Sequence, residues 1–272
     1  MQKMRRSQLY VPANNEKMIK KSLEIKADTI IFDLEDAVPP EEKGKAREML
    51  KQFISELDWG KEKELAVRVN EISTKEGLRD LIQVAELGKI NTILIPKAEG
   101  NLSFVHKATG KEIIPIVESA KGLFKIEDVL TSEGVSAITY GIADLSLSLE
   151  GKVDEYIKND YVRTKIIVSA KAYNVEAIDR VYFDLKDPEG FRQECLKAKN
   201  LGYNGKQAIH PSQVEIANTV FSPTEEEVEW AKRVIEAYEK SIKEGRGAIR
   251  VDDKLVDYVH YKLAKRILST PH

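Results

Sequence analysis

The sequence contains one cysteine, Cys195, in 272 residues. A single cysteine excludes an intrachain disulfide and a cysteine cluster for zinc or iron–sulfur. Long apolar runs are also missing: none approaches the ~20 residues that span a bilayer, and no apolar segment follows the basic start of the chain. From these absences we expect a cytoplasmic protein with no membrane partner.

Neither sign of charge dominates the chain. There are 43 basic and 45 acidic residues, which gives a net charge of −2. This balance provides no reason to expect a nucleic-acid partner. No P-loop or G-x-G-x-x-G motif follows an apolar run, so the most specific signals of nucleotide binding are absent.

The first 221 residues contain eight short apolar runs, most of them followed by a stretch with helical periodicity. The runs are residues 8–11, 29–34, 65–69, 92–96, 113–117, 137–143, 176–181 and 206–209. The longest helix predicted in this region covers residues 156–173. Eight strand–helix units with short connections predict an α/β protein with a closed (β/α)8 TIM barrel, and an open doubly wound sheet is the main competitor.

Polar side chains collect just beyond the apolar part of successive predicted strands. They are Asp33, Glu35, Asp36, Arg68, Asn70, Lys97, Glu118, Asp144, Asp179, Arg180, Asp184 and His210. In a barrel they would converge on the carboxyl-terminal face, where such enzymes have their active sites, whereas an open sheet would spread them along a line. The distribution therefore favours the barrel.

The composition changes after residue 221, which predicts a catalytic barrel domain of residues 1–221 and a C-terminal extension of residues 222–272. Predicted elements of the extension are a helix that runs through residue 243, a hairpin of residues 248–251 and 254–256 turned at Asp252-Asp253, and a helix at 258–268. The barrel does not need these elements. We therefore expect the extension to pack against the barrel or a neighbouring subunit.

Glu118 and Asp144 each end one of two consecutive apolar runs. Two neighbouring strands could thus hold one Mg²⁺, which typically takes one or two carboxylates together with waters and substrate oxygens. The alternative is that each carboxylate only caps the helix that follows or balances its dipole. Spacing alone leaves both interpretations open.

Arg68 ends another predicted strand, and its planar guanidinium could bind the carboxylate of an acidic substrate. The alternative is a structural ion pair with Asp33, Glu35 or Asp36. Both can hold together, because an acidic neighbour would orient the guanidinium.

Two more strand-end residues have weaker claims to catalysis. His210 is a possible general base, but we favour a role in positioning the backbone around a ligand. Lys97 could form a Schiff base, as in some barrel aldolases. Schiff-base chemistry would not need the Glu118 and Asp144 pair, so we do not favour this role for Lys97.

An ordered set of motifs resembles the citrate lyase β-subunit-like (CitE-like) family, which includes malyl-CoA and citramalyl-CoA lyases within the HpcH/HpaI aldolase superfamily. The motifs lie at residues 6–12, 33–38, 68–70, 96–97, 117–119, 141–145 and 208–211. The likeness covers nearly the whole chain. It implies a Mg²⁺-binding TIM barrel that cleaves or forms a carbon–carbon bond in a 3-hydroxyacyl-CoA thioester. The implied substrates are malyl-CoA, citramalyl-CoA or citryl-CoA, and the products are acetyl-CoA and an oxo acid.

The resemblance also implies roles for individual residues. Glu118 and Asp144 match the metal-binding carboxylates, Arg68 matches the arginine that holds the oxo acid, and Glu35 resembles its supporting acid. The positions that match coenzyme A contacts are Tyr10, Lys21 and Ile209. Asn15 departs from the pattern, because some malyl-CoA lyases have an arginine there near the coenzyme.

Residues 245–248 and 254–257 resemble a C-terminal segment of malyl-CoA lyases, whose aspartate enters the active site of an adjacent subunit. The resemblance makes Asp257 a candidate catalytic acid/base and implies a homo-oligomer, a homotrimer or a multiple of one. Without it, Asp257 would be read as the exposed N-cap of the last helix.

Two other functions remain as alternatives. One is a class II aldolase that acts on hydroxy-oxo acids without coenzyme A, and the other is a non-catalytic subunit that binds coenzyme A or serves assembly. The joint presence of Glu118, Asp144, Arg68 and Asp257 argues against the non-catalytic subunit.

Overall fold

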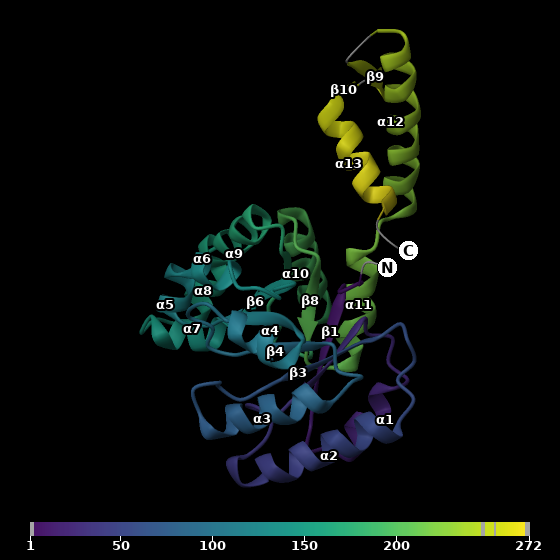
Figure 1. Cartoon of the computed structure of the whole chain (residues 1–272). Coiled ribbons are helices and arrows are strands. Elements are labelled where there is room, and N and C mark those ends of the chain that lie inside the picture. The colour runs from purple at the N-terminus through teal and green to yellow at the C-terminus, as the bar shows by residue number, and fades with distance from the viewer. Residues whose placement is uncertain (1–2, 246–247, 253, 270–272) are drawn as a thin grey trace. The chain divides into compact units, whose positions relative to one another are not determined.

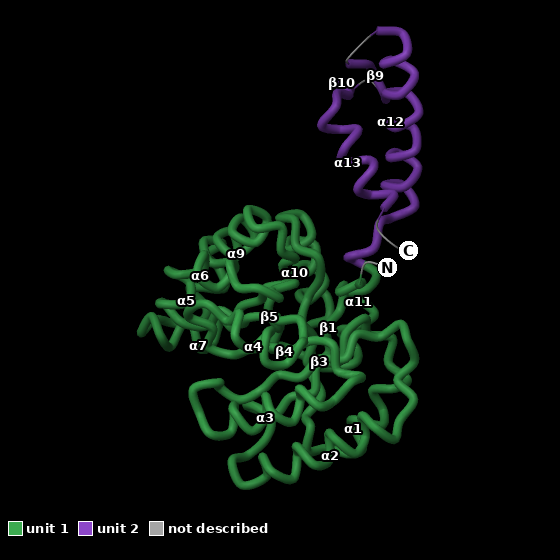
Figure 2. Tube along the Cα trace, in the orientation of Figure 1, with its two compact units in different colours: residues 1–219 green, residues 220–272 purple. Residues whose placement is uncertain are grey.

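The structure, a computed structural model, describes residues 3–245, 248–252 and 254–269. Internal contacts divide the chain into two compact units, residues 1–219 and residues 220–272 (Figure 2). Within the described ranges, no helix has both the length and the apolar character to cross a membrane.

The first unit is a closed barrel of eight parallel strands in sequential order, surrounded by helices (Figure 1). The strands are β1 Ser7–Pro12, β2 Thr29–Asp33, β3 Glu64–Arg68, β4 Thr92–Ile95, β5 Glu112–Val117, β6 Ala137–Tyr140, β7 Glu176–Asp179 and β8 Gly205–Ala208. Pairing of β8 with β1 closes the barrel. The TIM-barrel prediction is confirmed, and an open sheet is excluded.

The connections between strands are mostly helical. They contain α1 Glu16–Ser22, the 3₁₀ helix η1 Pro40–Glu42, α2 Lys43–Glu56, α3 Lys75–Glu86, α4 Ser103–Thr109, α5 Ala120–Phe124, α6 Ile126–Leu130, α7 Ile142–Ser148, α8 Val153–Lys158, α9 Tyr161–Ala172 and α10 Pro188–Leu201; α11 Pro211–Phe221 follows β8.

The prediction of one helix over residues 156–173 is wrong, because α8 ends at Lys158 and α9 starts at Tyr161. The backbone of Asn159 between them is extended, and its side-chain oxygen accepts a hydrogen bond from the Tyr161 amide at 2.8 Å. Asparagine competes with helical hydrogen bonds through such local contacts, which explains the break.

The barrel interior has a short apolar layer that includes Ile31, Ala66, Ile114, Ile116 and Ile178. Strand residues two apart point to the same side. Charged residues at both ends of the same strands therefore point inward as well. At the carboxyl ends these are Asp33, Arg68 and Glu118, and at the amino ends they are Glu64, Glu112 and Glu176.

A buried ion cluster closes the amino-terminal end of the barrel. The Arg5 side chain is 4% exposed and bonds Glu64 through two contacts of 2.8 Å, with Glu112 at 2.9 Å and Glu176 at 3.0 Å. Burial alone would raise the pKa of Glu64, but the hydrogen bonds and charge of Arg5 bring it down to about 2. This end is thus fixed by paired charges.

The second unit is an antiparallel hairpin with two helices: α12 Glu225–Lys243, β9 Ile249–Val251, β10 Lys254–Val256 and α13 Tyr258–Ser269. Thr224 and Glu227 form a reciprocal capping box at the start of α12. The predicted hairpin is present. Asp253 of its predicted turn, and residues 246–247 of the C-terminal motif, lie outside the described residues.

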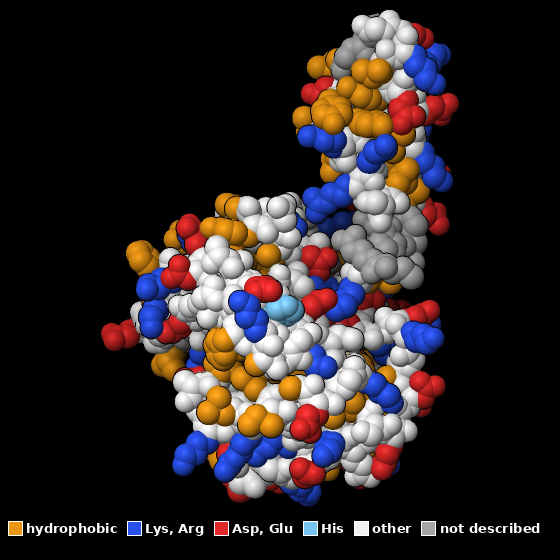
Figure 3. All heavy atoms as spheres, viewed as in Figure 1, with side chains coloured by type: hydrophobic (Ala, Val, Ile, Leu, Met, Phe, Trp, Pro, Cys, Tyr) orange, Lys and Arg blue, Asp and Glu red, His pale blue; other side chains and the backbone are white. Residues whose placement is uncertain are grey.

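One face of the second unit is apolar over β10 and α13 (Figure 3). The exposed large apolar side chains of these two elements are Leu255, Tyr258, Val259 and Leu263. Beneath them lies a small buried core of Ala231, Val234, Val256 and Ala264.

Candidate active site

Arg68 is the last residue of β3 and points into the carboxyl-terminal end of the barrel. Its guanidinium makes a two-point contact with Asp33, at 2.8 and 2.6 Å. It also lies 3.0 Å from Glu35 and 3.1 Å from Asp36. The structural ion pair considered for Arg68 is therefore present, and it fixes the guanidinium where a substrate carboxylate could approach.

Glu35 lies in the loop after β2 and is 7% exposed. Its Oε2 atom lies 3.0 Å from Arg68 Nη1 without the geometry of a hydrogen bond, and it has no hydrogen-bond partner among the residues that the structure describes. Burial raises the pKa of Glu35 to about 8; Arg68 opposes the rise, and Asp36, Glu118 and Asp33 add to it. The guanidinium cannot cancel the rise, since it is shared among three carboxylates.

Glu118 follows β5 and is 5% exposed. Its Oε1 atom accepts a hydrogen bond from the backbone amide of Lys97 at 2.8 Å. A Cβ atom on Gly141 would lie 2.6 Å from Glu118 Oε2, so a larger residue there would force the carboxylate to shift. The backbone that follows β4 and the backbone that follows β6 therefore both lie against the Glu118 carboxylate.

Asp144 lies exposed in the first turn of α7, the helix that follows β6. Burial raises the pKa of Glu118 to about 7, and the charges of Asp144 and Asp36 contribute to the rise. The two predicted metal ligands therefore follow two paired neighbouring strands, β5 and β6, at the carboxyl-terminal end of the barrel.

These carboxylates fit a hard divalent cation. The raised pKa values of Glu35 and Glu118 indicate that negative charge exceeds positive charge in this site. A bound cation would balance that excess. In the described part of the chain no group of three or more His, Cys, Asp and Glu side chains could hold a metal. Glu118 and Asp144 would leave the other coordination positions to water and substrate, as Mg²⁺ commonly does.

Tyr10 of β1 packs with the apolar layer of the barrel, and its ring lies 5.0 Å from the Arg68 guanidinium. Burial raises the pKa of the phenol well above its usual range, so Tyr10 is neutral. The neutral ring packs against the Arg68 guanidinium, in an arrangement typical of cation–π contacts.

Ile209 and Lys21 are the other two predicted coenzyme contacts, and neither is buried. Ile209 follows β8 at the carboxyl-terminal end, where its amide donates to Gln213 at 2.9 Å. Lys21 is exposed in the last turn of α1. His210 is exposed, and its Nδ1 atom lies 2.8 Å from Ser212 Oγ, a local contact at the start of α11.

Asp179 does not join the cluster, and the expected convergence is wrong for this residue. It is fully buried and bonds Lys206 at 2.6 Å, Arg163 at 3.0 Å and Tyr140 at 2.9 Å. Arg163 belongs to α9, so this network joins strands to the helical layer. The reason is that Asp179 follows inward-facing Ile178 by one residue and thus points outward.

Asp257 precedes α13 in the second unit. Its Oδ1 atom accepts from the amide of Val259 at 2.9 Å and lies 2.8 Å from Nδ1 of His260. The N-cap geometry of the simpler interpretation is present, and the carboxylate is half exposed. The hydrogen bond from His260 lowers the pKa of Asp257.

Lys43 is a site residue that the sequence did not reveal. This buried lysine at the start of α2 donates hydrogen bonds to the carbonyls of Leu34 and Glu35, at 2.8 and 2.7 Å. It fixes the loop that carries Glu35. Its position within a charged amphipathic helix gave no signal of this role.

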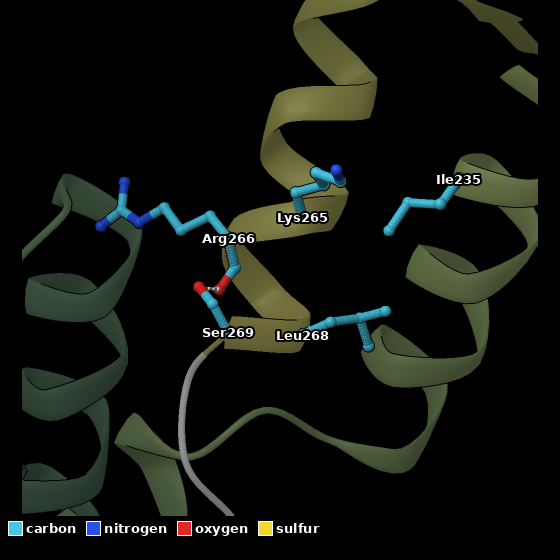
Figure 4. Close-up of a pocket in the computed structure, with 5 residues that line it drawn as sticks. All are labelled: Ile235, Lys265, Arg266, Leu268 and Ser269. Atoms are coloured by element: carbon cyan, nitrogen blue, oxygen red, sulfur yellow. Dashed lines mark hydrogen bonds between the residues drawn. The ribbon is translucent and has the colours of Figure 1, made fainter. Parts of the chain in front are cut away.

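A shallow pocket in the second unit lies between α12 and α13 (Figure 4). Its lining residues are Ile235, Lys265, Arg266, Leu268 and Ser269. None of them is among the predicted site residues. The chemistry is therefore sought at the carboxyl-terminal end of the barrel.

Several known proteins are similar to this chain in sequence and in architecture. The chain is 35% identical over 268 residues to a (3S)-malyl-CoA thioesterase of Cereibacter sphaeroides, covering 97% of this chain and 93% of the relative. It is 33% identical to citrate lyase subunit beta of Haemophilus influenzae, covering 98% and 97%.

A solved structure of CitE from Mycobacterium tuberculosis, in complex with magnesium, acetoacetate and coenzyme A, is similar with a TM-score of 0.82. It is 28% identical, and the match covers 96% of each chain. The family described as HpcH/HpaI aldolase/citrate lyase matches residues 6–211, three quarters of the chain. The chain therefore belongs to the HpcH/HpaI aldolase/citrate lyase family of carbon–carbon lyases.

Proposed function

We propose that this protein is a Mg²⁺-dependent lyase that cleaves or forms the carbon–carbon bond of a 3-hydroxyacyl-CoA thioester. The substrate is malyl-CoA, citramalyl-CoA or citryl-CoA, and the products are acetyl-CoA and an oxo acid. The observation that carries the proposal is the position of Arg68, Glu118 and Asp144, which end or follow β3, β5 and β6 at the carboxyl-terminal end of one barrel. The magnesium and coenzyme A in the CitE structure, and the names of the relatives, support it.

Cleavage turns the 3-hydroxyl group into a carbonyl and releases the enolate of acetyl-CoA. Glu118 and Asp144 would hold Mg²⁺, whose chemistry is Lewis-acid stabilisation of charge on substrate oxygens. Arg68 binds the carboxylate of the oxo-acid part, oriented by Asp33 and Glu35. Tyr10, Lys21 and Ile209 contact coenzyme A.

Asp257 completes the reaction by proton transfer. In cleavage the 3-hydroxyl group loses its proton as the carbonyl forms, and Asp257 in its protonated form gives a proton to the enolate carbon. In synthesis Asp257 takes a proton from the acetyl methyl group, and the new 3-hydroxyl oxygen takes one up. A carboxylate is a weak base for that carbon, so exclusion of water around it is needed. We propose that Asp257 comes from a neighbouring copy in a homotrimer or a multiple of one.

Hydrolysis is a second candidate, because the relatives that are 35% identical are malyl-CoA thioesterases. A hydrolase would release free coenzyme A and the hydroxy acid, whereas a lyase releases acetyl-CoA and the oxo acid. A class II aldolase would instead turn over free hydroxy-oxo acids.

The test is an assay of the three thioesters with Mg²⁺ and with chelator, in which acetyl-CoA, free coenzyme A and oxo acid are measured separately. We expect acetyl-CoA and oxo acid in equal amounts, and no turnover with chelator. Release of free coenzyme A alone would establish hydrolysis, and turnover of only coenzyme-free acids would overturn the proposal.

A further inference from the structure

Lys97 stands at the carboxyl-terminal end of the barrel, two residues after β4, between the strands that carry Arg68 and Glu118. Its backbone is left-handed, with φ +50°. This conformation is easy for glycine and costly for other residues. Such strain at a site residue is a reason to ask what the side chain does.

The backbone of Lys97 has a task that needs no lysine. Its amide donates to Glu118 Oε1 at 2.8 Å. Glycine would give the same hydrogen bond with less strain. A function of the backbone alone therefore does not account for the lysine side chain.

The side chain of Lys97 has fewer carboxylate partners than that of Arg68. Arg68 already contacts three carboxylates, of Asp33, Glu35 and Asp36, at 2.6 to 3.1 Å. For Lys97 the ion pair described is one contact of 3.4 Å with Glu71, with both side chains about 40% exposed or more. A long, exposed pair of this kind contributes little and is easily exchanged.

The ammonium group belongs to the same end of the barrel as the acid cluster. Its ion-pair partner Glu71 follows Arg68 by three residues, and β4, which Lys97 follows, pairs with β3. An anion that enters beside Arg68 would thus meet a second cation that comes from the neighbouring strand.

We propose that Lys97 is a specificity-determining residue, whose ammonium group exchanges Glu71 for a second carboxylate on the oxo-acid part of the substrate. This rests on the proposed function, in which Arg68 holds the first carboxylate. The lysine then favours dicarboxylic oxo acids over monocarboxylic ones. Phosphate groups of coenzyme A share the anionic chemistry, but they are carried by the thioester part and so are separated by the test.

The experiment is calorimetric binding of oxaloacetate and of glyoxylate to the full chain, with Mg²⁺ and without any thioester. Lys97→Gly removes the ammonium group and keeps the left-handed backbone and the amide to Glu118. Lys97→Arg keeps the charge. Asn174→Gly is the matched control, because Asn174 also has a left-handed backbone, with φ +56°, but precedes β7 at the opposite end of the barrel.

We expect Lys97→Gly to weaken oxaloacetate binding about tenfold and glyoxylate binding less than about twofold, the loss of one charge-assisted contact. Lys97→Arg should restore most of the difference, and Asn174→Gly should bind both acids like the wild type. Equal losses for both acids, or none, would overturn the proposal. In a separate titration with acetyl-CoA, a loss in Lys97→Gly that is seen only there would assign the ammonium group to the coenzyme and overturn the proposal too.

Different results would overturn the lyase proposal and the Lys97 proposal. If no thioester is cleaved but the preference for oxaloacetate depends on Lys97, the specificity role stands without the lyase chemistry. If the Arg68→Met variant binds both acids like the wild type, the proposed oxo-acid site is wrong, whatever Lys97 does.

Discussion

The two ends of the barrel use the same residue types for opposite purposes. Both place one arginine among several carboxylates, and β3 and β5 carry charges to both ends. At the amino end the pKa of Glu64 falls to about 2, because Arg5 bonds it directly. At the carboxyl end the pKa of Glu118 rises to about 7 and that of Glu35 to about 8.

The difference is one of charge balance. Arg5 is buried among acids that it bonds with good geometry, so the amino end is complete and contributes to stability. Arg68 is shared among Asp33, Glu35 and Asp36, and Glu118 lies beyond its direct contacts. The carboxyl end is left with an excess of buried acid, which a bound cation would relieve. Carboxyl ends of barrel strands are where such enzymes work.

Replacement of one glutamate at each end by isosteric glutamine should give the largest effects and separate the two ends most clearly. We expect Glu118→Gln to lower kcat by about a thousandfold or more, because the loss of metal-held charge stabilisation costs several kcal/mol. Its amide oxygen can still accept from Lys97, so the fold should be retained. Turnover of the thioester with saturating Mg²⁺ is the measurement.

Glu64→Gln is the matched variant at the amino end. It leaves Arg5 buried with a weakened partner and should cost about 3–5 kcal/mol in the free energy of unfolding, measured with urea. Turnover per folded molecule should not change. If Glu64→Gln abolished turnover in folded protein, or Glu118→Gln left it intact, the division of the two ends would be wrong.

Asp257→Asn tests whether the carboxyl end of the barrel needs a residue of the second unit for turnover. Asparagine caps a helix about as well as aspartate, so the variant removes the charge and keeps the cap. We expect kcat to fall about a hundredfold while substrate binding is unchanged.

A mixture of Asp257→Asn and Glu118→Gln chains provides the control for this variant. If Asp257 acts in a neighbouring copy, mixed oligomers should recover part of the turnover that each variant lacks. Unchanged turnover in Asp257→Asn alone would return this residue to the capping role.

Glu35→Gln should give the smallest effect, and one that depends on pH. The pKa of Glu35 is raised in the folded state, so its contribution to stability is present below its ordinary pKa of 4.5 and is lost as the pH rises through about 8. Without metal, the variant should therefore gain stability relative to the wild type as the pH rises from about 5 to about 8. Urea unfolding at pH 5 and pH 9 with chelator measures this, and a gain at pH 5 instead would contradict the assigned charge balance.

The barrel was predictable because its strands are buried on both sides and read as short apolar runs with charges at their ends. The convergence of Arg68 with Asp33, Glu35 and Asp36 followed from the same pattern. Asp179 escaped prediction, because a side chain one residue further along a strand points to the other face, and apolar runs do not show that alternation.

Other features depend on contacts that no linear pattern contains. The Lys97 amide donates to Glu118, and its backbone is left-handed, a conformation that a lysine in the sequence does not signal. Lys43 donates to two carbonyls from the start of a helix that contains two other lysines, Lys45 and Lys51. The break at Asn159 depends on one local hydrogen bond that competes with a helix of otherwise suitable composition.

The most direct test of the central claim is a calorimetric titration with Mg²⁺ at pH 8, above the pKa of Glu118. Wild type and Glu64→Gln should each bind one Mg²⁺ per chain with the same affinity, and Glu118→Gln/Asp144→Asn should show binding at least about a hundredfold weaker. Equal binding by the double variant would contradict the assignment of the metal to the carboxyl end of the barrel.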